Sequence, residues 1–311
     1  MTTREVEHEI TIDAPAAAVY RLLAEVTNWP RIFPPTIYVD QVGEHDNHER
    51  IRIWATANGE AKNWTSHREL DPEGLRITFR QEVTTPPVAA MGGTWIIETL
   101  AENSSRVRLL HDYRAIDDDP EGLAWIDEAV DKNSRSELAA LKQNVELAHA
   151  TEEVTFSFTD TVIVQGSPKD LFDFINEANL WSERLPHVAV VRLTEDTPGL
   201  QTLEMDTRAK DGSVHTTTSY RVTFPNPKIA YKQITLPALM TLHTGIWTFE
   251  ETPEGTAASS QHTVTLNTDN IAKILGPEAT VADAREYVHT ALSTNSTATL
   301  NHAKTYAESK G

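Results

Sequence analysis

The strongest constraint on the fold is an internal repeat. When the sequence is shifted by 152 or 153 residues, unrelated signals come into register in the same order. The matched pairs are Pro15 and Pro168, Trp29 and Trp181, Ser66 and Ser219, Arg68 and Arg221, Gly93 and Gly245, and Trp95 and Trp247. Two copies of this length indicate a duplicated domain, because the repeats of a solenoid are shorter and more numerous. The sequence therefore predicts two related domains, residues 1–150 and 151–311, each of ordinary domain size.

Each copy has the same predicted order of elements. A first strand, over residues 5–12 or 156–164, precedes a helix with a proline near its start. Short alternating segments with turn signals follow and predict antiparallel strands. An apolar stripe then predicts a long closing helix, through Leu123, Ile126, Val130, Leu138, Leu141 and Val145 or through Val281, Ala284, Val288, Leu292 and Leu300. This order predicts an α+β fold in which a curved antiparallel sheet wraps around the last helix.

Composition excludes several classes of protein. There is no cysteine, so neither disulfide bonds nor thiolate chemistry is possible. The 27 basic residues stand against 46 acidic ones, for a formal charge of −19, and such a surface would repel a nucleic-acid backbone. The N-terminus lacks the apolar core of a signal peptide, and no apolar run approaches the roughly 20 residues of a membrane helix. We therefore expect a cytoplasmic protein that binds neither nucleic acid nor membrane.

Motifs for cofactors and metals are missing from the sequence. No glycine-rich phosphate loop follows a strand, and no GxSxG elbow is present. The 12 histidines do not show HExxH or a comparable ligand spacing. We therefore expect no cofactor and no metal. The chemistry that remains is acid–base and electrostatic catalysis by polar side chains in a pocket.

Strand alternation places two arginines on interior faces. In the strand over residues 62–70, the face marked as interior by its apolar members carries Trp64, Ser66 and Arg68. The equivalent face of the second copy carries His215, Thr217, Ser219 and Arg221. An unpaired buried cation costs several kcal/mol, so two of them at matched positions need an explanation. Either each arginine pairs with a buried acid or reaches the sheet edge, or both serve a ligand.

Other polar and aromatic residues fall on interior faces as well. They are Gln81, Trp95, His111 and Tyr113 in the first copy, and Gln233, His243, Trp247 and His262 in the second. A single histidine on an apolar face is often a hydrogen-bonded core residue, and a glutamine can satisfy backbone groups. A closed core, however, rarely tolerates this many hydroxyl, imidazole and guanidinium groups. The set therefore favours an internal cavity for a polar, partly aromatic ligand.

Several of these residues form patterns that resemble a known family. The segments Trp29-Pro30-Arg31-Ile32-Phe33 and Trp64-Thr65-Ser66-His67-Arg68, with Trp95 and Asn133-Ser134, are similar to motifs of the polyketide aromatase/cyclases, which have the helix-grip (START-like) fold. The second copy keeps Trp181, Pro186, Ser219-Tyr220-Arg221, Trp247 and Asn295-Ser296. The resemblance covers essentially the whole chain, and the duplication points to the di-domain members of bacterial type II polyketide synthases. The helix-grip outline alone is less specific, because lipid carriers and plant-type ligand binders share it.

The resemblance implies an enzyme of antibiotic biosynthesis that acts on a poly-β-ketone tethered to acyl carrier protein. It implies closure of the first ring between carbons seven and twelve by aldol chemistry, dehydration to an aromatic ring, and partnership with the minimal polyketide synthase. By position, Trp64, Ser66 and Arg68 would line the pocket, whereas Thr217 replaces the tryptophan in the second copy. A tyrosine of single-domain relatives has no clear match, since Pro34-Pro35-Thr36 occupies its place.

Charge suggests a role for each candidate residue. Arg68 and Arg221, with Ser66 and Ser219 beside them, would stabilise enolate oxygens without giving up a proton. Proton transfer would fall to His111 and Tyr113 in the first domain and to His243 and His262 in the second. The remaining interior residues would contact the substrate: Trp64, Trp95, Gln81, Thr217, His215, Trp247 and Gln233. We expect two related sites with different tasks.

Two other roles stay open. A non-enzymatic carrier or chaperone would hold a hydrophobic ligand in the same cavity without turnover. Alternatively, one domain would only support the other or dock to a synthase complex. Product profiles of variants on the interior faces distinguish these roles, because only an enzyme changes its products when such residues are replaced.

Overall fold

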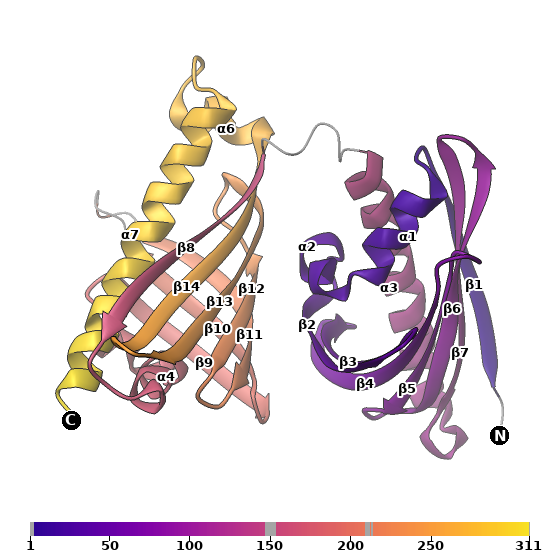
Figure 1. The fold of residues 1–311 in the computed structure, drawn as a ribbon, viewed down its shortest axis with the longest axis horizontal. Coiled ribbons are helices and arrows are strands. Elements are labelled where there is room, and N and C mark those ends of the chain that lie inside the picture. The colour runs from indigo at the N-terminus through magenta and orange to yellow at the C-terminus, as the bar shows by residue number, and fades with distance from the viewer. Residues whose placement is uncertain (1–2, 147–153, 209–211, 213, 311) are drawn as a thin grey trace. The chain divides into compact units, whose positions relative to one another are not determined.

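Two seven-stranded antiparallel sheets are the framework of the computed structural model, which describes residues 3–146, 154–208, 212 and 214–310. The chain divides into two compact units, Met1–Ala150 and Thr151–Gly311. Each unit holds one sheet and one long helix (Figure 1). The predicted pair of α+β domains, each with a long closing helix, is confirmed.

The first domain begins with strand β1 and ends with helix α3. Its strands are β1 (Arg4–Ile12), β2 (Thr36–His45), β3 (His48–Ala57), β4 (Glu60–Asp71), β5 (Arg76–Val83), β6 (Val88–Ala101) and β7 (Ser104–Ala115), and its helices are α1 (Ala16–Ala24), α2 (Trp29–Ile32) and α3 (Pro120–Glu146). The strands are ordered β1-β7-β6-β5-β4-β3-β2 in the sheet. Only the β1–β7 pair joins strands distant in sequence, so the rest is a meander of hairpins.

The second domain repeats this arrangement and adds one short helix, α6. Its strands are β8 (Thr155–Val164), β9 (Val188–Thr197), β10 (Leu200–Arg208), β11 (Val214–Phe224), β12 (Lys228–Thr235), β13 (Met240–Thr252) and β14 (Gly255–Leu266), and its helices are α4 (Pro168–Asn176), α5 (Trp181–Arg184), α6 (Ile271–Leu275) and α7 (Val281–Glu308). The order β8-β14-β13-β12-β11-β10-β9 matches that of the first sheet.

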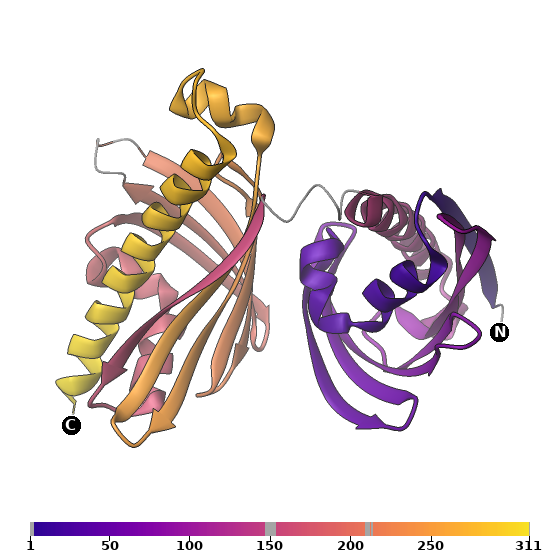
Figure 2. The ribbon, with the colours of Figure 1, turned by 45° about the horizontal axis from the view of Figure 1, so that its top comes forward.

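Each long helix lies against the sheet of its own domain (Figure 2). Helix α3 packs mainly on β1 and β7, and α7 packs on β8, β14 and α4. The predicted stripes supply these contacts, because Ile126, Val130, Leu138, Leu141 and Val145 are buried, as are Ala284, Val288 and Leu300. Burying these faces removes apolar surface from water, which is the main force that holds each helix in place.

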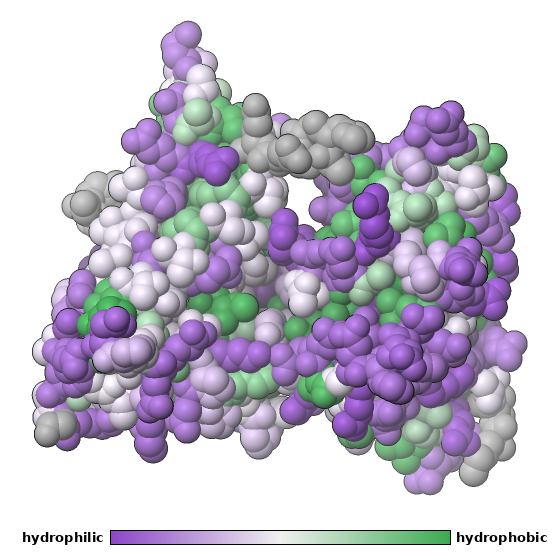
Figure 3. All heavy atoms as spheres, viewed as in Figure 1, coloured by the Kyte–Doolittle hydropathy of each residue, from purple (hydrophilic) through white to green (hydrophobic). Residues whose placement is uncertain are grey.

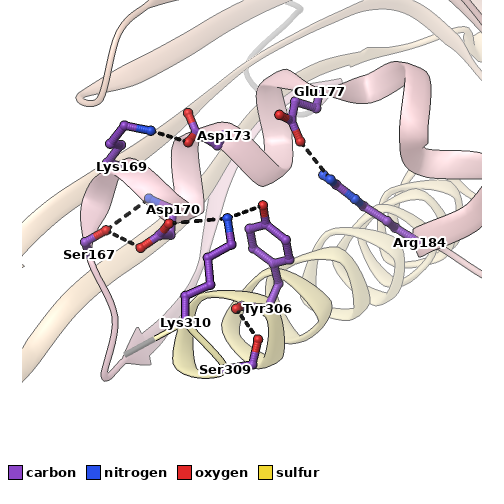
Figure 4. Close-up of polar contacts among 9 residues, drawn as sticks. All are labelled: Ser167, Lys169, Asp170, Asp173, Glu177, Arg184, Tyr306, Ser309 and Lys310. Atoms are coloured by element: carbon purple, nitrogen blue, oxygen red, sulfur yellow. Dashed lines mark hydrogen bonds and ion pairs between the residues drawn. The ribbon is translucent and has the colours of Figure 1, made fainter.

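Polar contacts anchor the end of α7 to α4 (Figure 4). The Nζ atom of Lys310 lies 3.6 Å from a carboxylate oxygen of Asp170 and 4.2 Å from the ring centre of Tyr306. Asp170 also accepts a hydrogen bond from the hydroxyl of Ser167, which caps the start of α4. These contacts tie the last turn of the closing helix to the first turn of the helix it packs on.

On the face shown in Figure 3, hydrophilic side chains predominate over both units, and hydrophobic residues form scattered spots. Among the described residues, no helix is both long and apolar enough to cross a membrane.

Candidate functional site

Lys62, on the same face of β4 as Trp64, borders a hollow at the surface of the first domain. The hollow has a volume of about 400 Å³ and lies between Lys62, Trp125 at the start of α3 and the loop before β6. Further along the same strand face, Trp64 is half-buried, whereas Ser66 is 2% and Arg68 1% exposed. Exposure therefore falls from the hollow inward, and Trp64 is the predicted residue of this strand nearest to the opening.

Arg68 closes the C-terminal end of α1. Its guanidinium donates hydrogen bonds to the carbonyl oxygens of Leu23 (2.9 Å) and Ala24 (3.3 Å), which have no partner within the helix. It also lies 5.1 Å from the ring centre of Trp29 and 3.2 Å from a carboxylate oxygen of Glu49. Burial lowers the pKa of Arg68 to about 10, so the side chain remains charged at neutral pH. Arg68 thus pairs with an acid, as the structural alternative expected.

Arg221 has the same place in the second domain. It donates a 2.6 Å hydrogen bond to the carbonyl oxygen of Ile175 near the end of α4, and it lies 5.3 Å from the ring centre of Trp181. The indole of Trp181 in turn donates to the carbonyl oxygen of Phe174. In both domains at least one guanidinium donor binds a carbonyl oxygen at a helix end, and the arginine side chains are almost inaccessible. These contacts give both arginines a structural role at a helix end, and the role of Arg68 and Arg221 toward a ligand stays a prediction.

The two arginines differ in their electrostatic surroundings. Glu49 lies opposite Arg68 on the neighbouring strand, and Gln201 lies opposite Arg221. The Nη1 atom of Arg221 and the Oε1 atom of Gln201 are both buried without a hydrogen-bond partner among the described residues. In the second domain the opposite charge comes from Glu195, whose carboxylate also accepts a hydrogen bond from Gln201, and not from the matched strand position.

His111 on β7 is a half-buried base of the first domain. It follows the interior alternation of Leu109 and Tyr113, and its Nδ1 atom has no hydrogen-bond partner among the described residues. Its ring meets Phe79 edge to face at 5.5 Å. Burial, with a smaller contribution from His8, lowers the pKa of His111 to about 4, so the imidazole is neutral at pH 7. A neutral imidazole of this kind can accept a proton from a ligand.

Sequence reasoning missed an acid in the same domain, Glu137. This residue lies on α3 one turn from the buried Ser134 and one turn from the buried Leu141, on the side of the helix that packs on the sheet. Burial raises the pKa of Glu137 to about 8, so most of it is protonated at pH 7. Helix α3 packs against β7, the strand that carries His111. A charged residue type within an apolar helical stripe was the signal that could have identified it.

The other predicted residues of the first domain have more local roles. The hydroxyl of Tyr113 donates a 2.6 Å hydrogen bond to Asp127 on α3, and burial raises its pKa. Tyr113 therefore ties the helix to the sheet. Gln81 is half-buried, with its amide 3.4 Å from the sulfur of Met91, and Trp95 is buried in the core. Of these, only Gln81 keeps accessible surface on the interior face.

The interior of the second domain contains a hydrogen-bonded network. Nδ1 of His243 donates to Oε1 of Gln233 at 2.8 Å, and Nε2 of His243 lies 3.0 Å from Nδ1 of His262. The other nitrogen of His262 lies 3.0 Å from the hydroxyl of Ser260. The hydroxyl of Tyr231 lies 3.0 Å from Nδ1 of His262 and 3.3 Å from Nε2 of His243. The structure thus brings three predicted residues together and adds Tyr231 and Ser260, which the sequence reasoning missed.

The remaining predicted residues of the second domain are spread along the interior face. Ser219 and Trp247 are buried, and Thr217 is half-buried. His215 is exposed near the start of β11, so its predicted interior position is wrong. The strand extends beyond the packed part of the sheet there, and alternation alone cannot reveal where packing ends.

No group of three or more potential ligand side chains could hold a metal ion in the part of the chain that the structure describes.

Comparison with known proteins identifies the family. Models of the family described as "Polyketide cyclase / dehydrase and lipid transport" match residues 3–146 and residues 164–281. The bifunctional cyclase/dehydratase of the granaticin polyketide synthase from Streptomyces virginiae is 62% identical over 305 residues, which cover 96% of this chain and 98% of that protein. Its counterpart in the actinorhodin polyketide synthase of Streptomyces coelicolor is 42% identical over 308 residues, with 96% and 95% covered.

Solved structures agree with this result. The di-domain ARO/CYC BexL from the BE-7585A biosynthetic pathway is 68% identical, with a TM-score of 0.89 and with 98% of this chain and 99% of that chain covered. The di-domain ARO/CYC StfQ from the steffimycin pathway is 34% identical, with the same TM-score and coverage. This chain belongs to the polyketide cyclase/dehydrase family, as one of its di-domain aromatase/cyclases.

Proposed function

We propose that the protein is a bifunctional cyclase/dehydratase that closes the first ring of a poly-β-ketone and removes water to make it aromatic. The observation that supports this most directly is the presence of a neutral base, His111 on β7, and a protonated acid, Glu137 on α3, the helix that packs on β7; the substrate would lie between these two side chains. The relatives named for cyclase/dehydratase activity share the full length of the chain. The family's cyclisation between carbons seven and twelve is the regiochemistry we propose.

The pair can carry out dehydration with balanced protons. His111 would take the proton from the carbon next to a carbonyl, and Glu137 would protonate the departing hydroxyl to release water. The product gains a carbon–carbon double bond, and transfer of a proton from the imidazolium to the carboxylate restores both groups. Because the pKa of Glu137 is about 8, the carboxyl can give and regain a proton near neutral pH.

The side chains around this pair suit a flat, partly aromatic chain. Trp64 lies between the hollow and the interior, and Phe79 contacts His111. Gln81 has an amide that can bind a carbonyl oxygen of the substrate. Arg68 acts indirectly, by holding the end of α1 against the sheet. We propose that the chain enters from the hollow while it is attached to acyl carrier protein, as a component of a polyketide synthase.

Reconstitution with a minimal synthase tests this function. We would profile the products with and without the ketoreductase, using the wild-type protein, Glu137→Gln and His111→Phe, with Glu128→Gln as an exposed control on the same helix. Both interior variants should lose the aromatic product by at least about tenfold, and the control should keep it. If the products with the wild-type protein equal those without any protein, the function is wrong and the carrier role is favoured. Isotope labelling of the wild-type product tests the proposed ring closure.

A further inference from the structure

Three matched interior positions are apolar in the first domain and polar in the second. Tyr231 occupies the position of Phe79. Tyr231 pairs with Gly245 on the next strand, and Phe79 pairs with the matching Gly93 in the first domain. By the same register His243 replaces Met91, and Ser260 replaces Leu109. Three apolar side chains of one copy are thus polar in the other. Buried polar groups destabilise a protein unless they form hydrogen bonds with one another or with a ligand.

The hydrogens in this network can be placed from the chemistry of its members. The amide oxygen of Gln233 can only accept, so Nδ1 of His243 carries the hydrogen and Nε2 of His243 is an acceptor. Burial lowers the pKa of His243 to about 3 and that of His262 to about 4. Both imidazoles are therefore neutral at pH 7, and no charge resides in the network.

Tyr231 is the least buried of the hydroxyl and imidazole groups in the network. Its side chain is half-buried, whereas His243, His262 and Ser260 are at most 4% exposed. A Cβ atom at Gly245 would lie 2.4 Å from the hydroxyl oxygen of Tyr231 and 2.5 Å from the carbonyl oxygen of Gln261, so the hydroxyl rests against the backbone at this glycine. Burial also raises the pKa of Tyr231, which keeps the phenol protonated.

The network allows two arrangements of hydrogens with the same charge. In one, Tyr231 donates to a histidine nitrogen. In the other, Ser260 donates to Nε2 of His262, and the Nδ1 hydrogen of His262 is shared between Nε2 of His243 and the oxygen of Tyr231, which leaves the phenol hydrogen for a ligand. A hydroxyl that accepts one hydrogen bond donates a stronger one. The three groups behind Tyr231 therefore favour donation toward an electron-rich oxygen.

We propose that the second domain contains its own oxyanion site, in which the Tyr231 hydroxyl binds an enolate or phenolate oxygen of the polyketide, with His262, His243 and Ser260 as positioning residues. This rests on the proposed polyketide substrate. The helix position that carries Glu137 in the first domain is held by Thr299 in the second, so the second domain lacks that acid. The second site thus stabilises negative charge on oxygen, whereas the first transfers protons.

The variants that test this site use residues that the fold already accepts in its other copy. Tyr231→Phe and His243→Met install the first domain's residues, and Tyr287→Phe makes the same chemical change at an exposed tyrosine of α7. We would titrate each full-length protein with 1,8-dihydroxyanthraquinone at a pH where the probe is partly ionised. We would also measure products in the reconstituted synthase. Tyr231→Phe should weaken binding of the ionised probe about tenfold and lower the aromatic product severalfold, with Tyr287→Phe unchanged.

Two results would overturn the site. The first is a Tyr231→Phe protein that binds the probe and forms products within twofold of wild type while Glu137→Gln abolishes activity. The second is an effect of Tyr287→Phe as large as that of Tyr231→Phe. If the wild-type protein does not alter the products at all, the proposed function fails, and the binding titration still decides whether Tyr231 holds an anionic oxygen.

Discussion

Glu49 forms an ion pair with Arg68, with 3.2 Å between Oε2 and Nη1, and the second domain has the neutral Gln201 in the matched place. Both arginines hold the end of the first helix of their domain, so the carboxylate is not needed for the geometry itself. Its contribution is electrostatic, because a buried guanidinium without an opposite charge is destabilising.

Replacing Glu49 with glutamine should therefore destabilise the first domain. The shape of the side chain is kept while the charge is lost, and we expect the free energy of unfolding to fall by roughly 2–3 kcal/mol. Chemical denaturation monitored by tryptophan fluorescence measures this. Glu82→Gln breaks an exposed ion pair with Arg50 and should change stability by less than about 0.5 kcal/mol. Equal changes in the free energy of unfolding for the two variants would show that burial does not strengthen the ion pair of Glu49 and Arg68.

Glu137→Gln should stabilise the protein at neutral and alkaline pH. The folded protein keeps this carboxyl protonated up to a pKa of about 8, whereas the unfolded chain ionises near 4.5. Between these values the unfolded state has lost more protons, so stability falls as pH rises, and the amide removes that dependence. We expect a gain of roughly 3–5 kcal/mol at pH 8 and almost none at pH 4. Thermal melts of wild type, Glu137→Gln and the control Glu128→Gln across this pH range measure the effect. If the melting temperature of Glu137→Gln depends on pH in the same way as that of wild type, the prediction is wrong.

Acid should destabilise the second domain through its two buried histidines. Their folded pKa values of about 3 and about 4 lie below the unfolded value of 6.5. Between these limits the unfolded chain binds more protons, so this part of the stability is present above pH 6.5 and is lost as pH falls. Between pH 7 and pH 5, the free energy of unfolding of His243→Met should fall by about 2 kcal/mol less than that of wild type. The exposed control His302→Met should lose stability in acid as wild type does. If His243→Met loses just as much, the histidines are not held neutral by the network.

Exchanging Trp64 and Thr217 should alter the products of the enzyme. Trp64→Thr places in the first domain the residue that the second domain has at this position. It removes a large flat side chain next to the hollow through which we propose that the substrate enters. We expect a higher apparent KM by about tenfold and a larger share of products with other ring closures, because a wider site holds more conformations of the chain. Thr217→Trp is the reciprocal variant. Chromatographic product profiles that match those of wild type for Trp64→Thr would exclude this role.

Much of the fold could be predicted from the sequence because its signals are local and repeated. The alternation of strands, the prolines at the first helices and the stripe from Ile126 to Val145 each depend on backbone periodicity, which a chain displays before it folds. The duplication then made each signal visible twice. The interior direction of Ser66, His111, His243 and His262 followed from the same periodicity.

Only the tertiary structure decided what these interior residues do. Alternation placed Arg68 and Arg221 on the inner face, but the helix ends they bind come from another part of the chain, so a ligand role and a structural role looked alike. The interior position of Glu137 depends on which side of α3 packs on the sheet, and this is set by the packing of the whole helix. Tyr231 joined the histidines only through pairing of three strands. The sequence by itself determined two copies of one sheet-and-helix domain, and the packing between elements determined that one interior carries an acid and a base and the other a neutral network.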